Sequence, residues 1–179
     1  MNNPSSPPSQ PGTPTPAPAI DPIQLENYRQ ELRAQQNLPF GLLGGVAGLV
    51  VSAVIWALVT VALDRQIGYM AIGVGFLVGL GVRLLGKGLD PIFGILGAAL
   101  SLIGVLAGNI LTVVILLSRE FGVSVTDVLA QLDLGEVLSA LIQGSEVIDW
   151  LFYALALYFG YRFSIRQITA KDLAKLSSV

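Results

Sequence analysis

The polar side chains that could do chemistry in this sequence are few, and they lie within long apolar segments. Asn109 and Thr112 are three residues apart in the apolar run 91–117, so they share a similar face of a helix. An amide in hydrocarbon must find a hydrogen-bond partner. Asn109 therefore predicts either a bond to a neighbouring helix or, together with Thr112, the polar lining of a substrate or ion path.

A second polar group ends the preceding apolar run. Arg83 and Lys87 are four residues apart, near an expected membrane boundary, where long basic side chains extend to the headgroups. They are candidates for contact with a lipid phosphate or another anion, beside a purely structural role. The sequence Gly86-Lys87-Gly88 lacks the GxxxxGK[ST] spacing of a phosphate-binding loop. Asp90 follows it and is expected to cap the next helix.

The sequence contains neither histidine nor cysteine. This excludes thiol nucleophiles, disulfides, iron–sulfur clusters and histidine-based zinc or haem sites. No apolar run carries Asp, Glu or Lys at its centre, where ion-coupled transporters usually place one. We therefore expect no enzyme activity, no cofactor and no metal. A net charge of −2 without a basic run gives no reason to expect nucleic acid as a partner.

Composition places the chain among membrane proteins. Hydrophobic residues make up 53% of it and charged residues only 12%, with a mean hydropathy of +0.71, well away from soluble domains. Helices of about 20 apolar residues cross a hydrocarbon core of about 30 Å. The sequence therefore predicts an all-α, polytopic membrane protein with four transmembrane helices. The predicted spans are residues 40–63, 67–85, 91–117 and 147–163.

The segments outside the spans are of two kinds. Residues 1–20 hold seven prolines and no charge, which is typical of a disordered tail because such a segment buries no core. Residues 21–38 are expected to form a juxtamembrane amphipathic helix that Asp21 caps and Pro39 ends. The remaining divisions are a four-helix domain over residues 39–165 and a short basic tail over residues 166–179.

The connection between the third and fourth spans differs from the other turns. Residues 118–120, Ser-Arg-Glu, are expected to close the third span. Residues 121–146 then contain two short apolar stripes, one after Ser124 or Thr126 and one after Asp133, and these residue types cap helices well. Both stripes are too short and too acidic to cross a bilayer. We expect two short amphipathic helices in the membrane interface.

The basic residues favour one orientation in the membrane. With the N-terminus inside, eight Lys and Arg face the cytoplasm and two face the other side, a strong positive-inside bias. We therefore expect both termini in the cytoplasm (N-in/C-in) and the acidic connection 121–146 on the opposite side. The cytoplasmic set is Arg29, Arg33, Arg83, Lys87, Arg162, Arg166, Lys171 and Lys175, and the opposite set is Arg65 and Arg119.

Small residues recur at helical spacing along the second and third spans. Such faces allow helices to approach closely in a membrane. We expect a tight antiparallel hairpin between these two spans, while part of the face could instead meet a second copy of the protein or line a narrow path. The predicted packing residues are Gly75, Gly79, Gly97, Ser101, Gly104 and Gly108.

Five stretches of the sequence resemble a family of bacterial integral membrane proteins with four helices. They read NLPFGLLGG, WALVT, IGYMAIGVGFLVGLGVRLLGKGLDPIFGILGA, LAGN and DWLFYALALYFGYRFS, and they cover most of residues 37–169. The resemblance implies a location in the bacterial inner membrane and four helices. The family has no assigned activity, so the resemblance implies no catalytic or binding residues.

Two functions stay open on the sequence. The first is a scaffold or interaction protein, a glycine-packed and self-associating bundle whose cytoplasmic tails contact partners. The second is a small oligomeric channel or transporter with a path lined by Asn109, Thr112 and Arg83. Membrane lipids and a second copy of the chain are the expected partners, and the sequence does not identify a protein partner.

Overall fold

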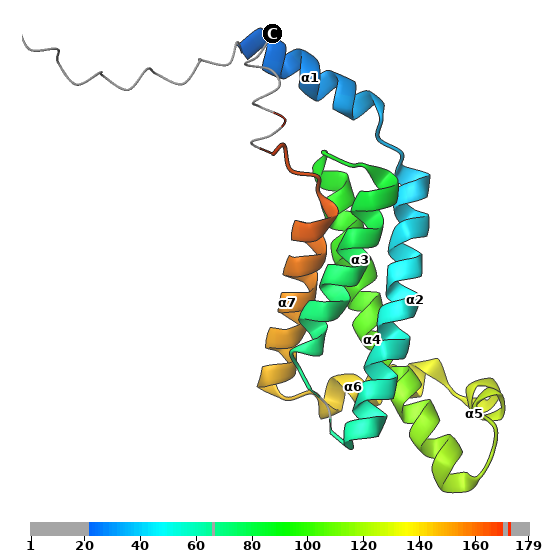
Figure 1. Cartoon of the computed structure of the whole chain (residues 1–179). Coiled ribbons are helices and arrows are strands. Elements are labelled where there is room, and N and C mark those ends of the chain that lie inside the picture. The colour runs from blue at the N-terminus through cyan, green and yellow to red at the C-terminus, as the bar shows by residue number, and fades with distance from the viewer. Residues whose placement is uncertain (1–21, 66, 170–171, 173–179) are drawn as a thin grey trace, which may run out of the picture. The chain divides into compact units, whose positions relative to one another are not determined.

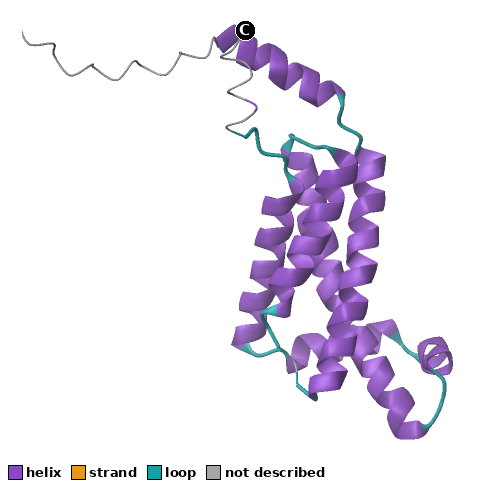
Figure 2. Ribbon diagram, viewed as in Figure 1, coloured by secondary structure: helices purple, strands orange, loops and turns teal. Residues whose placement is uncertain are grey.

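The computed structural model describes residues 22–65, 67–169 and 172, and every regular element in these residues is a helix (Figures 1 and 2). The all-α prediction is confirmed for this part of the chain. The helices are α1 (Pro22–Ala34), α2 (Leu38–Leu63), α3 (Met70–Gly86), α4 (Pro91–Phe121), α5 (Val125–Gln131), α6 (Leu134–Gly144) and α7 (Val147–Ser164).

Two helices are long and apolar enough to cross a membrane, namely α2 and α4. A third candidate exists if α6 and α7 form one span, with a bend of 113° between the two helices. The helix α3 is apolar but has only 17 residues. Apolar helices that could span a membrane are therefore present, as the composition predicted.

The chain divides into two compact units. One is Gln30–Gln167, and the other combines Met1–Arg29 with Ile168–Val179. The packed helices α2, α3, α4 and α7 belong to the first unit. The predicted tail 1–20, the cap Asp21 and most of the basic tail lie outside the described residues.

The helix borders lie within four residues of the predicted segments, and the largest differences are at the ends of α1 and α4. The helix α1 ends at Ala34, and Pro39 belongs to the first turn of α2, where its missing N–H costs no hydrogen bond. Asn37 caps α2, its side-chain Oδ1 accepting from the backbone N–H of Phe40 at 3.1 Å. The helix α4 continues through residues 118–120 and stops where Gly122 adopts a φ of 64°.

The amphipathic connection forms the two predicted helices. Ser124 caps α5 by accepting from the N–H of Asp127, and Asp133 caps α6 by accepting from two backbone N–H groups of its first turn. Neither helix contains a buried residue. Both are therefore surface helices, attached to the end of α4 and the start of α7 (Figure 1).

Four helices of the unit Gln30–Gln167 pack side by side: α2, α3, α4 and α7 (Figure 1). Both α3 and α4 contact α2 on one side and α7 on the other, and they also contact each other. Outward-facing side chains of α2, such as Val50 and Leu58, are more than half exposed. The core between the four helices consists of Trp56, Ala71, Val74, Val78, Val82, Phe93, Leu100, Val105 and Ala156.

The helices α3 and α4 contact each other, but most of their small residues lie against other helices. A Cβ added at Gly75 would lie 2.9 Å from the carbonyl oxygen of Ala156 in α7, and one added at Gly79 would lie 2.7 Å from the Cβ of Phe163. The small face of α3 is thus packed against α7 rather than α4. A spacing of small residues fixes where a close approach is possible, and it does not choose the partner helix.

The small face of α4 is shared among three helices. At its start, Gly97 abuts Gly160 and Ser164 of α7, and the hydroxyl of Ser101 is turned inward to the Gly97 carbonyl at 2.7 Å. Further along, a Cβ at Gly104 would lie 2.9 Å from Val74 of α3. One at Gly108 would lie 2.8 Å from the Trp56 ring of α2.

Candidate functional site

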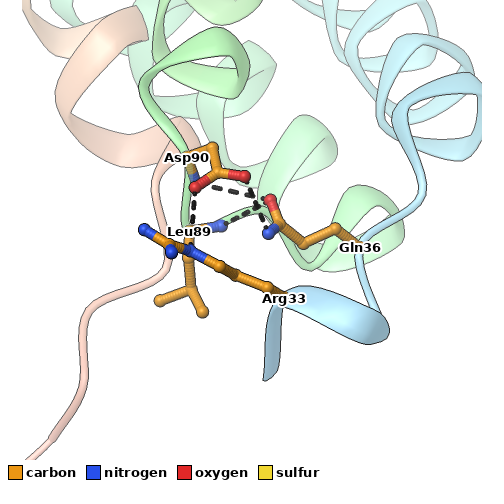
Figure 3. Close-up of polar contacts among 4 residues, drawn as sticks. All are labelled: Arg33, Gln36, Leu89 and Asp90. Carbon is orange, nitrogen blue, oxygen red and sulfur yellow. Dashed lines mark hydrogen bonds and ion pairs between the residues drawn. The ribbon is translucent and has the colours of Figure 1, made fainter. Parts of the chain in front are cut away.

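A polar cluster holds the segment before α2 against the turn between α3 and α4 (Figure 3). The side chain of Gln36 makes three hydrogen bonds there. Its Oε1 accepts from the backbone N–H of Leu89 at 3.2 Å and of Asp90 at 3.3 Å, and its Nε2 donates to Asp90 Oδ2 at 3.0 Å. The guanidinium of Arg33 lies 3.2 Å from the other oxygen of Asp90. One amide therefore joins two segments that are more than 50 residues apart in sequence.

The cluster corrects the predicted role of Asp90. This residue precedes α4, as expected of an N-cap, but its side chain makes no capping hydrogen bond. Both carboxylate oxygens are taken by Arg33 and Gln36 instead. The pair with Arg33 is largely open to solvent, with 57% of the Arg33 side chain and 42% of the Asp90 side chain exposed, so we expect it to contribute less than the Gln36 bonds.

Two backbone hydrogen bonds complete this end of the bundle. The N–H of Asn37 donates to the carbonyl of Gly86 at 2.9 Å, and the N–H of Arg166 donates to the carbonyl of Gly88 at 2.8 Å. The short turn 86–90 thus holds both the chain that enters α2 and the chain that leaves α7.

Arg83 and Lys87 lie beside this turn. Arg83 is in the last turn of α3, and Lys87 is its C-cap, with a φ of 49° and its N–H donating to the Arg83 carbonyl at 3.0 Å. Lys87 is exposed and Arg83 is half-buried. Within the described part of the chain, no acidic side chain forms an ion pair with either residue. Both positive charges are available to an anion at the end of α3.

Asn109 lies at the other end of the bundle, in a small polar cavity. Only 6% of the residue is exposed, and its side chain has no hydrogen-bond partner among the described residues. The cavity has a volume of about 140 Å³. Its walls come from α4, the last turn of α6 and the first turns of α7. The lining residues are Asn109, Ala140, Leu141, Gly144, Ser145, Asp149 and Tyr153.

The predicted path residues are not brought together. The hydroxyl of Thr112 donates to the Gly108 carbonyl of its own helix at 2.8 Å, an ordinary way to satisfy a hydroxyl inside a membrane helix. Arg83 lies at the end of the bundle where α7 stops, whereas the Asn109 cavity lies where α7 starts. Two further polar atoms of α2, Trp56 Nε1 and Thr60 Oγ1, are buried without a partner.

Comparisons with known proteins do not decide the function. No protein family, curated protein or solved structure matches the chain.

Sequence reasoning missed Gln36 at one site, and Ser145, Asp149 and Tyr153 at the other. Gln36 follows a helix and carries no charge, so no pattern marks it. The other three lie within nine residues of one another and come after the predicted interfacial helices. The bend between α6 and α7 brings these three side chains to one cavity. The sequence indicates two adjacent helices but not the angle between them.

Proposed function

We propose that the chain is an integral membrane protein with four spans, α2, α3, α4 and α7. The proposal is supported by the packing of α3 and α7 along the two long apolar helices, α2 and α4. Helices that pack side by side in one bundle lie at the same depth in the bilayer. At 1.5 Å per residue, the 17 residues of α3 extend about 25 Å, close to a hydrocarbon core of about 30 Å. Modest thinning of the bilayer accommodates such a mismatch.

The orientation we propose has both termini in the cytoplasm of a bacterial inner membrane. It is supported by the positions of the basic residues. Four basic residues lie in or beside the segments that the turn 86–90 holds together: Arg33, Arg83, Lys87 and Arg166. At the opposite end of the bundle, Arg65 follows α2 and Arg119 lies in the last turn of α4. A basic end on the cytoplasmic side follows the positive-inside rule.

Within this topology, a scaffold or interaction protein is the function that the geometry supports best. The observation that carries it is the polar cluster of Gln36, which fixes the segment after α1 to the turn 86–90. A bundle built on backbone-to-backbone glycine contacts is rigid, and the cluster makes its cytoplasmic end rigid as well. Rigid display of a chain segment reduces the entropy lost when a partner binds.

This function is tested by purification of the intact, tagged protein from native membranes. We expect a partner, or a second copy of the chain, to co-purify with the wild type and to be reduced by Gln36→Ala. The matched control is Glu136→Gln, a change on α6 away from the cluster. Recovery of the wild type alone, as a monomer, would contradict the scaffold function.

A small oligomeric channel or transporter is the second candidate, and one observation favours it. The buried amide of Asn109 lines a polar cavity, as a path residue would. Thr112 and Arg83 give this candidate no support, because the first bonds its own helix and the second lies at the other end of the bundle. The measurement is leak of potassium and of small neutral solutes from liposomes that contain the purified protein. Impermeable vesicles would exclude a path for the solutes used.

A further inference from the structure

The Asn109 cavity combines a free amide with a carboxylate. Asp149 uses Oδ2 to accept the backbone N–H of Glu146 at 2.9 Å, as part of the capping box that starts α7. Its second carboxylate oxygen has no hydrogen-bond partner in the described chain. The hydroxyl groups of Ser145 and Tyr153 are 3.5 Å apart on the same wall. The Ser145 hydroxyl also donates to the Leu141 carbonyl at 2.6 Å. The cavity is therefore lined by one free carboxylate oxygen, by two hydroxyl groups that bond to each other and by one amide that can accept or donate.

The stretch of sequence that supplies the α6 and α7 walls of the cavity carries only negative charges. Between Arg119 and Arg162 the sequence contains no Lys, Arg or His. The helix α6 ends at Gly144 on the cavity wall, so its last carbonyls and the negative end of its dipole face this region. Acidic residues of the same stretch are Glu120, Asp127, Asp133, Glu136, Glu146 and Asp149. Such a field attracts cations and repels anions.

The size and donor set restrict the kind of cation. The described residues hold no group of three or more His, Cys, Asp or Glu that could bind a metal ion, and a single carboxylate is a poor site for a divalent cation. A volume of about 140 Å³ corresponds to a few water molecules at about 30 Å³ each. That space fits an organic cation of a few non-hydrogen atoms better than a bare ion.

Aromatic rings add a feature that ammonium groups prefer. Tyr153 lines the cavity, and its ring packs edge-to-face against Trp150 with the centroids 5.8 Å apart. An ammonium group is attracted to the face of such a ring and donates hydrogen bonds to carboxylate and amide oxygens. We propose that the cavity formed by Asn109, Asp149 and Tyr153 is a binding site for a small protonated amine. This inference goes beyond the scaffold function and does not depend on it.

The test is calorimetric titration of the full-length protein in lipid nanodiscs with methylammonium chloride. We expect a saturable heat for the wild type. Asp149→Asn removes the charge but keeps an oxygen that can cap α7, and Asn109→Leu removes the amide at similar volume. Each variant should weaken binding by about tenfold or more, the effect of losing one charge-assisted hydrogen bond. Glu136→Gln removes one negative charge of α6 that does not line this cavity, and it should change the affinity less than twofold.

Three results would overturn the proposal. The first is no saturable heat with methylammonium. The second is equal affinity of Asp149→Asn and the wild type. The third is the same saturable heat with sodium chloride, which would assign the cavity to inorganic monovalent cations. Circular dichroism and the melting temperature check the fold of each variant, and Asn109→Leu keeps the test decisive if Asp149→Asn disturbs the start of α7.

Discussion

Gly44 of α2 and Gly81 of α3 cross backbone to backbone. A Cβ built on either residue would collide with the carbonyl oxygen of the other. The same arrangement recurs where Gly97 of α4 crosses Gly160 of α7. Two glycine crossings therefore hold the four helices in pairs, and each leaves no room for a methyl group.

Gly81→Ala should destabilise the bundle because the new methyl group must push α2 away. Overpacking of this kind costs about 1–3 kcal/mol. The matched control is Gly73→Ala on the same helix, where an added Cβ meets nothing within 4 Å. The control should be neutral or slightly stabilising, since alanine favours a helix by about 1 kcal/mol over glycine. Melting temperatures in detergent measure both, and equal values for the two variants would contradict the crossing.

Gly104 should tolerate alanine far better than leucine. A Cβ there approaches the methyl group of Val74 at 2.9 Å and lies 3.5 Å or more from Leu49 and Ser52, so small side-chain shifts accommodate it. A leucine side chain would need the space that α2 and α3 occupy. We expect Gly104→Leu to lower the melting temperature or change the elution volume, and Gly104→Ala to do neither. An unchanged Gly104→Leu protein would contradict the packing of this face.

Gln36→Ala should loosen the turn 86–90 specifically. The backbone N–H groups of Leu89 and Asp90 lose their acceptor in this variant. Loss of a hydrogen bond that contributes about 1 kcal/mol corresponds to roughly fivefold faster amide exchange. Hydrogen exchange with mass spectrometry measures the peptide that contains this turn. Arg33→Ala is the control and should have a smaller effect, because its ion pair is exposed. Equal exchange rates in the wild type and Gln36→Ala would show that the Gln36 side chain does not stabilise the turn.

The proposed topology makes a prediction about reporter fusions. A reporter that is active only in the cytoplasm should work when fused at Val179 and fail when inserted near Asp133, because these positions are expected on opposite sides. A reporter active only outside the cytoplasm should give the reverse pattern and serves as the control. Activity of the cytoplasmic reporter at Asp133 would overturn the orientation.

The helices could be predicted from the sequence because their signals are local. Apolar runs and capping residues identified α4 from Pro91 and α6 from Leu134, and the structure places both starts there. The helix α4 continues about one turn past the predicted span 91–117, because charged residues such as Arg119 do not stop a helix, whereas a residue with positive φ such as Gly122 does.

The sequence did not predict which helices pack against the small-residue faces of α3 and α4. The pattern in α3 and α4 suggested a pair, yet α7 takes much of both faces. A signal was present in α7, where Ala156, Gly160 and Ser164 are four residues apart and all buried. Aromatic residues around them hide this spacing. Gln36 is a different case, because the meaning of a lone glutamine depends on a turn 50 residues away.

The turn 86–90 also has a consequence for the tails of the protein. Asn37 and Arg166 are hydrogen-bonded to Gly86 and Gly88, two residues apart, so the two flanking chains leave the bundle from carbonyls at most about 7 Å apart along the backbone. A molecule that binds one flanking segment then meets the other at an effective concentration on the order of millimolar. A ligand with two binding epitopes could then contact both segments at once. Its overall affinity would exceed its affinity for either segment alone.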